Sequence, residues 1–127
     1  MARIFFMAFE KAGQTALVKK LRNSGHKLAI TEPHYPEFYH LVKQQSPTPD
    51  VFVIDCSTQA SHARESCNYL KTLKAYRDVP FLLYNVKKDD EAATLAKVPG
   101  AQIIPNDQVE KALVSMGFRA PIAPSPP

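Results

Sequence analysis

The stretch around Asp55 holds the residues best suited to chemistry. Residues 50–58 read Asp-Val-Phe-Val-Ile-Asp-Cys-Ser-Thr, so four apolar residues lead directly to a carboxylate at Asp55. An uninterrupted apolar run that is rich in Val and Ile is typical of a strand buried on both faces of a parallel sheet. Open parallel sheets place their functional side chains beyond the carboxyl ends of the strands. Asp55 is therefore the first candidate for a functional residue.

The cysteines and histidines form no metal or catalytic pattern. Cys56 follows Asp55 directly, and we interpret it as a small buried residue in preference to a nucleophile. Cys56 and Cys67 lack the spacing of metal ligands. His34 and His40 are six residues apart, whereas zinc-binding histidine pairs on a helix are four apart. The histidines are predicted to be surface or hydrogen-bonded residues.

Strand patterns and helix patterns alternate five times along the chain. The strand-like runs lie at residues 3–9, 27–31, 51–55, 81–86 and 102–104. The helical patterns lie at residues 14–23, 61–75 and 89–97, with a shorter one that starts near Pro36 and a last one after Asp107. Successive β-α units of this kind predict an α/β fold with a parallel sheet.

Several polar and glycine residues delimit the predicted helices. Gly25 and Gly117 are predicted to end the first and last helices. Asp107 is predicted to cap the last helix with its side chain. The acidic residues at 89–91 precede a helical pattern, where negative charge is favoured by the helix dipole, so we do not interpret them as a metal site.

The composition indicates one ordinary water-soluble domain. The chain has 127 residues, of which 45% are hydrophobic and 22% charged, and no apolar run is long enough to cross a bilayer. The net charge is +4, but the basic residues are spread over several helices, so a nucleic-acid partner is not expected. Two cysteines are too few for a disulfide framework, which makes the cytoplasm the expected location.

The end of the sequence has a different composition from the rest. Residues 119–127 read Arg-Ala-Pro-Ile-Ala-Pro-Ser-Pro-Pro. Proline at this density is incompatible with a helix or a central strand. We therefore predict one domain over residues 1–118, followed by a proline-rich disordered tail or linker over residues 119–127.

The order of elements resembles the receiver domain of bacterial response regulators. The resemblance rests on the strand that ends in Asp55, on Val-Pro-Phe-Leu-Leu-Tyr-Asn at residues 79–85 and on Gly100-Ala101 before the fifth strand, and it covers residues 3 to about 117. It implies a flavodoxin-like fold, in which a five-stranded parallel sheet in the order 2-1-3-4-5 carries helices on both faces. It also places Asp55 at the position of the aspartate that accepts a phosphoryl group from a histidine kinase.

The resemblance breaks down at the positions that bind metal in receivers. The family holds magnesium with an acidic pair after the first strand, and those positions are Ala8 and Phe9 here. Neither side chain has an oxygen to offer to magnesium. An alternative is that the next residue, Glu10, turns inward and forms a magnesium site together with Asp55. If Glu10 does not bind magnesium in this way, no cofactor is expected.

The resemblance also breaks down at the other phosphate-binding positions. The Thr or Ser at the end of the fourth strand corresponds to Asn85, which can donate a hydrogen bond but has no hydroxyl. The family's lysine after the fifth strand is replaced by Pro105 or Asn106, so a cation is lost. The aromatic residue of that strand is replaced by an aliphatic, Ile103. Asn85 and Asn106, with Glu10, remain candidates for a pocket beside Asp55.

Three functions follow from these observations. The first is a receiver-like interaction module in bacterial signal transduction, which is not an enzyme and works without the usual aspartate phosphorylation. Its partner would be a histidine kinase, an output protein or a second copy of the chain, bound through the fourth and last helices near Lys111 and Arg119. The second function is a phosphoaccepting receiver of a two-component phosphorelay, modified at Asp55. The third is a small α/β enzyme or ligand-binding domain, although Gly13 stands alone where a phosphate-binding loop would need several glycines.

Overall fold

The computed structural model describes residues 2–9, 11–34 and 36–118. The five strands are β1 (Arg3–Met7), β2 (Lys27–Thr31), β3 (Val51–Asp55), β4 (Phe81–Tyr84) and β5 (Gln102–Ile104). The α-helices are α1 (Lys11–Asn23), α2 (Glu37–Lys43), α3 (Ala60–Thr72), α4 (Glu91–Lys97) and α5 (Val109–Ser115), and short 3-10 turns span Lys88–Asp90 and Asn106–Gln108. Glu10, Tyr35 and the tail at residues 119–127 lie outside the described residues, as does the predicted role of Glu10.

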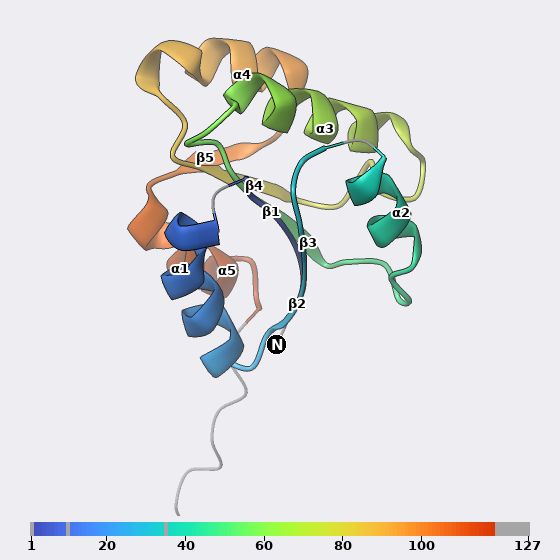
Figure 1. The fold of residues 1–127 in the computed structure, drawn as a ribbon, viewed down its shortest axis with the longest axis vertical. Coiled ribbons are helices and arrows are strands. Elements are labelled where there is room, and N and C mark those ends of the chain that lie inside the picture. The colour runs from blue at the N-terminus through green and yellow to red at the C-terminus, as the bar shows by residue number, and fades with distance from the viewer. Residues whose placement is uncertain (1, 10, 35, 119–127) are drawn as a thin grey trace, which may run out of the picture.

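The five strands form one parallel sheet in the order β2-β1-β3-β4-β5 (Figure 1). In the pairing of β3 with β4, Asp55 lies opposite Tyr84, the last residue of β4. The sheet is covered by helices on both faces, so the predicted flavodoxin-like fold and strand order are confirmed.

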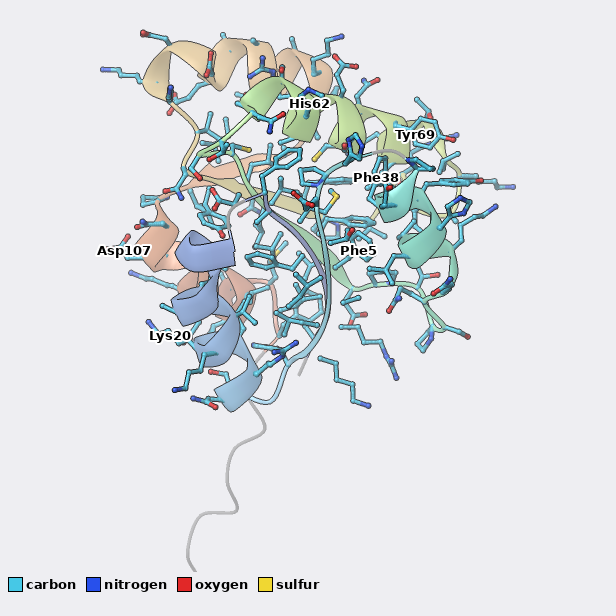
Figure 2. The ribbon with its side chains drawn as sticks, viewed as in Figure 1. Phe5, Lys20, Phe38, His62, Tyr69 and Asp107 are labelled. Carbon is cyan, nitrogen blue, oxygen red and sulfur yellow. The ribbon has the colours of Figure 1, made fainter. Side chains whose placement is uncertain are left out.

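Alternate residues of each strand pack on opposite faces of the sheet, because successive side chains of a strand point in opposite directions. Phe5 and Met7 belong to a core that α2 and α3 complete. Ile4 and Phe6 belong to a second core, which α1 and α5 complete. Figure 2 shows Phe5 among the side chains inside the fold, whereas Lys20 and Asp107 lie at its edge.

The strand limits differ from the predicted ones at two places. The first strand ends at Met7 instead of residue 9, because its partner β2 ends at Thr31, opposite Met7. The fourth strand ends at Tyr84 instead of residue 86, because Asn85 leaves the extended conformation with φ of 58°. The other three strands have the predicted limits.

The predicted helix ends are confirmed at two glycines and wrong at Asp107. Gly25 and Gly117 follow α1 and α5 with φ of 87° and 93°, a left-handed conformation that glycine adopts without steric cost. Asp107 does not cap α5, because it lies inside a 3-10 turn and the N-cap position falls on Gln108, which makes no side-chain capping hydrogen bond. The backbone N–H of Gln108 donates to the carbonyl of Pro105 at 3.0 Å, so a backbone turn leads into the helix.

His26 has a structural role. Its side chain is 7% exposed, and its Nδ1 accepts a hydrogen bond from the backbone N–H of Ala2 at 2.9 Å. Burial lowers the pKa of His26, since the charged form is harder to desolvate. The prediction of a hydrogen-bonded histidine is confirmed at this position.

The described helices include none that is long and apolar enough to cross a membrane.

Phe52 is the aromatic centre of the core beneath α2 and α3. It is fully buried, and its ring stacks on that of Phe81 at 4.7 Å and meets the edge of Phe5 at 5.6 Å.

We expect Phe52→Ala to lower the free energy of unfolding by about 3–5 kcal/mol, because it leaves a cavity that rigid neighbours cannot fill. Urea denaturation measures the change. Val114→Ala is the control, because Val114 is 47% exposed, and it should change stability by about 0.5 kcal/mol at most. A similar loss of unfolding free energy in the two variants would contradict this account of the core.

Candidate functional site

Asp55 lies at the carboxyl edge of the sheet with one of its oxygens engaged. The residue is 3% exposed. Its Oδ1 accepts hydrogen bonds from the backbone N–H of Ser57 at 2.9 Å and from Nδ2 of Asn85 at 3.1 Å. A buried carboxylate requires such donors, because it has lost its contacts with water. The structure thus brings together two residues that the sequence selected, Asp55 and Asn85.

The backbone conformation of Asn85 makes this contact possible. Its φ of 58° lies in the left-handed region, which asparagine tolerates better than most residues. The chain turns away from the sheet at this residue while the side chain stays next to Asp55. The sequence gives no local signal for this turn, because neither neighbour of Asn85 is a glycine or a proline.

Asn106 also reaches this edge of the sheet. Asn85 and Asn106 line a shared cavity of about 350 Å³, to which Ile103 and Glu91 also contribute. They line a second cavity of about 250 Å³ together with Lys20 and Tyr84. Asn85 and Asn106 therefore line the same two cavities, whereas Asp55 lines neither of them.

Lys20 is the residue of this region that the sequence did not reveal. It lies on α1, far from β4 and β5 in the sequence, and it is solvent-exposed. In the sequence it reads as one of several basic residues on a helix surface. Only the packing of α1 against the sheet places it beside a cavity that Asn85 and Asn106 line.

The residues after β1 are apolar at the two positions where receivers carry carboxylates. Ala8 is 1% exposed and presents only a methyl group. The ring of Phe9 lies against His62, with 6.0 Å between the ring centres. Within residues 2–9, 11–34 and 36–118, no three His, Cys, Asp or Glu side chains lie close enough together to hold a metal ion. The described side chains thus do not fit the magnesium ion that the resemblance implies.

Cys56 and Tyr84 are buried beside Asp55. Cys56 is 2% exposed, and burial, aided by the charge of Asp55, raises the pKa of its thiol to about 12. A thiol with this pKa stays protonated at neutral pH and is a poor nucleophile, so the prediction of a buried cysteine is confirmed. Burial also raises the pKa of Tyr84, and its hydroxyl has no hydrogen-bond partner among the described residues.

The role of Asn85 can be separated into a backbone part and a hydrogen-bond part. Both Asn85→Gly and Asn85→Ala remove the bond to Asp55, but only Gly adopts the left-handed conformation freely. We expect Asn85→Gly to cost about 1 kcal/mol of stability, and Asn85→Ala about 1 kcal/mol more. Urea denaturation of the two variants measures the difference. An alanine variant as stable as the glycine variant would contradict the strained turn.

Comparison with known proteins shows the fold. The sequence matches no protein-family model and no curated protein. Among solved structures, it is similar to the signal receiver domain of a signal transduction histidine kinase from Syntrophus aciditrophicus, with a TM-score of 0.70 and 18% identity. The match covers 91% of this chain and 86% of that one. At this level of identity the likeness establishes the architecture and not the chemistry. This chain therefore has the fold of a signal receiver domain.

Proposed function

We propose that this protein is a receiver-like interaction module in bacterial signal transduction that works without the usual magnesium-assisted phosphorylation of an aspartate. The observation that carries the proposal is the apolar end of β1. Ala8 and Phe9 occupy the positions where the resemblance calls for two carboxylates, and neither can ligate a hard cation.

The charge around Asp55 supports the same proposal. Phosphoryl transfer spreads negative charge over the phosphoryl oxygens, and catalysis depends on cations that neutralise it. The groups that bond Asp55 are the neutral side-chain amide of Asn85 and the backbone N–H of Ser57. Lys20 lines one neighbouring cavity, but Asp55 does not line that cavity. Among the described residues no lysine or arginine forms an ion pair with Asp55, although the charge of Arg64 reaches the neighbouring Cys56.

An exposed apolar residue on each of two helices supports binding to another protein. Leu95 on α4 is 45% exposed, and Val114 on α5 is 47% exposed. These helices precede and follow the edge strand β5. Lys111 is exposed on α5 as well, whereas Arg119 lies outside the described residues. Apolar residues with polar neighbours are the usual make-up of an interface centre.

One observation favours the alternative of a phosphoaccepting receiver. Oδ2 of Asp55 accepts no hydrogen bond from any group that the structure describes, since both donors go to Oδ1. A carboxylate oxygen in this state is available as a nucleophile. The alternative therefore requires a direct chemical test.

Treatment with acetyl phosphate provides that test. We expect no phosphoryl adduct on the intact protein by mass spectrometry, with or without magnesium, because Ala8 and Phe9 cannot hold the magnesium ion that would stabilise the transferring group. Asp55→Ala and the exposed Asp89→Ala are the matched variants, and circular dichroism confirms their fold. An adduct that requires magnesium, persists in Asp89→Ala and is lost in Asp55→Ala would overturn the proposal in favour of a phosphoaccepting receiver.

Site-specific photo-crosslinking tests the interaction surface. We replace Leu95, Val114 or, as a control, the exposed Lys74 by p-benzoylphenylalanine in the cells that make the protein. We expect positions 95 and 114 to capture the same protein, because α4 and α5 flank one edge of the sheet, and position 74 not to capture it. Equal capture from position 74, or capture from none, would refute this choice of surface.

A further inference from the structure

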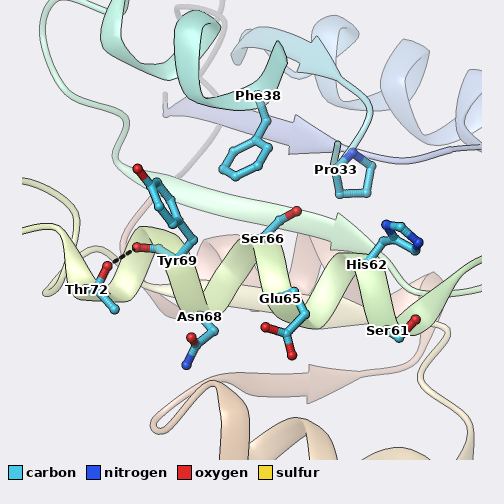
Figure 3. Close-up of a pocket in the computed structure, with 9 residues that line it drawn as sticks. All are labelled: Pro33, Phe38, Ser61, His62, Glu65, Ser66, Asn68, Tyr69 and Thr72. Carbon is cyan, nitrogen blue, oxygen red and sulfur yellow. Dashed lines mark hydrogen bonds between the residues drawn. The ribbon is translucent and has the colours of Figure 1, made fainter. Parts of the chain in front are cut away.

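A cavity of the described chain lies away from Asp55, in a groove between α2 and α3. Its volume is about 470 Å³, which is within the usual range of small-molecule sites, about 300–1,000 Å³. Figure 3 shows the groove with α3 along one side and Phe38 of α2 and Pro33 along the other. The two cavities that Asn85 and Asn106 line have no lining residue in common with this groove.

Aromatic side chains form the walls of this α2–α3 groove. Phe38 is 1% exposed and extends from α2 toward α3. The ring of Tyr69 meets it edge-on, with 6.1 Å between the ring centres. Tyr39 in turn meets Tyr69 edge-on at 5.6 Å. Rings held by their neighbours in this way offer a rigid apolar surface against which another flat ring can pack.

Ser66 places a single polar group in the middle of the groove. The residue is 5% exposed, and its hydroxyl makes no hydrogen bond with any group that the structure describes. Figure 3 shows this hydroxyl directed from α3 into the groove, toward Phe38 and Pro33. A serine inside a helix usually bonds a carbonyl of the preceding turn or faces water. The hydroxyl of Ser66 bonds no such carbonyl and opens into the groove, so it is available to a hydrogen-bonding ligand.

The charges along the groove favour a neutral ligand. Glu65 is the one acidic residue among the described residues that line the groove, and its Oε1 pairs with Nζ of Lys97 at 3.0 Å. No lysine or arginine is among the described residues that line the groove. An anionic ligand would therefore lose its hydration without gaining a partner, and a cationic one would meet a carboxylate that is already paired.

We propose that the α2–α3 groove binds a neutral, planar aromatic molecule whose carbonyl or hydroxyl group hydrogen-bonds to Ser66. The aromatic rings select a flat apolar body, and the hydroxyl of Ser66 orients its polar group. Glu65 is already paired and no described lining residue is a lysine or arginine, so a ligand without net charge is favoured. The proposal does not depend on the state of Asp55, which lies at the carboxyl edge of the sheet.

A titration with 2-naphthamide tests the proposal. This probe is flat, neutral and carries one amide. We follow the backbone amide resonances of the full chain by nuclear magnetic resonance at pH 8, where histidine side chains carry little charge. We expect saturable shifts at Ser66 and Tyr69. The anion 2-naphthoate and the saturated decahydronaphthalene-2-carboxamide should each bind at least about tenfold more weakly.

Three variants locate the bound probe. Ser66→Ala keeps the helix and removes the hydroxyl, so it should weaken binding about threefold to tenfold. Ser66→Leu should abolish binding by filling the groove. Ser115→Ala removes an exposed hydroxyl of α5, which bonds the carbonyl of Lys111, and should leave the affinity unchanged.

The opposite results would overturn the proposal. They are the absence of saturable shifts, shifts centred on another surface, or an affinity that Ser66→Ala does not change. Equal binding of 2-naphthoate would overturn the preference for a neutral ligand. If Ser66→Leu fails to fold, the comparison of Ser66→Ala with Ser115→Ala decides the question, because both changes are conservative in a helix.

Discussion

The burial of β3 on both faces is the constraint on which the rest of the structure depends. All five residues from Val51 to Asp55 are buried, with the two helical layers on either side. A central strand of this kind can carry a charge only at its end, where the carboxylate reaches hydrogen-bond donors. Those donors are the backbone of Ser57 and the side chain of Asn85. The location and the neighbours of the candidate site thus follow from how the core is built.

The packing of this sheet is compatible with apolar residues at the positions where receivers carry carboxylates. Strand order and layers depend on the apolar residues of the two cores, most of which lie away from the positions where receivers bind metal. Ala8 packs as part of one core, and Phe9 contacts His62. Apolar groups at these positions avoid the mutual repulsion of crowded carboxylates. The architecture therefore does not by itself identify the activity.

Locally unfavourable features gather at the carboxyl edge of the sheet. Asn85 holds a left-handed conformation, and the buried hydroxyl of Tyr84 lacks a partner among the described residues. Features of this kind are retained where the surrounding structure enforces them, and they concentrate at functional sites. The α2–α3 groove has a comparable feature in Ser66, so two separate surfaces of this small domain carry groups that the fold itself does not satisfy.

The order of strands and helices, the limits of β2, β3 and β5, and the position of Asp55 at a strand end could be predicted from the sequence, because these features depend on periodicity within short segments. The sequence did not determine where β1 and β4 end, since a strand stops where its partner stops or where the backbone turns, as at Asn85. The prediction that Asp107 caps the last helix was wrong, because Asp107 lies inside a 3-10 turn. Lys20 beside Asn106, and Phe38 beside Ser66, come from segments far apart in the sequence. Only tertiary packing decided these contacts, because no local pattern records which helix faces meet.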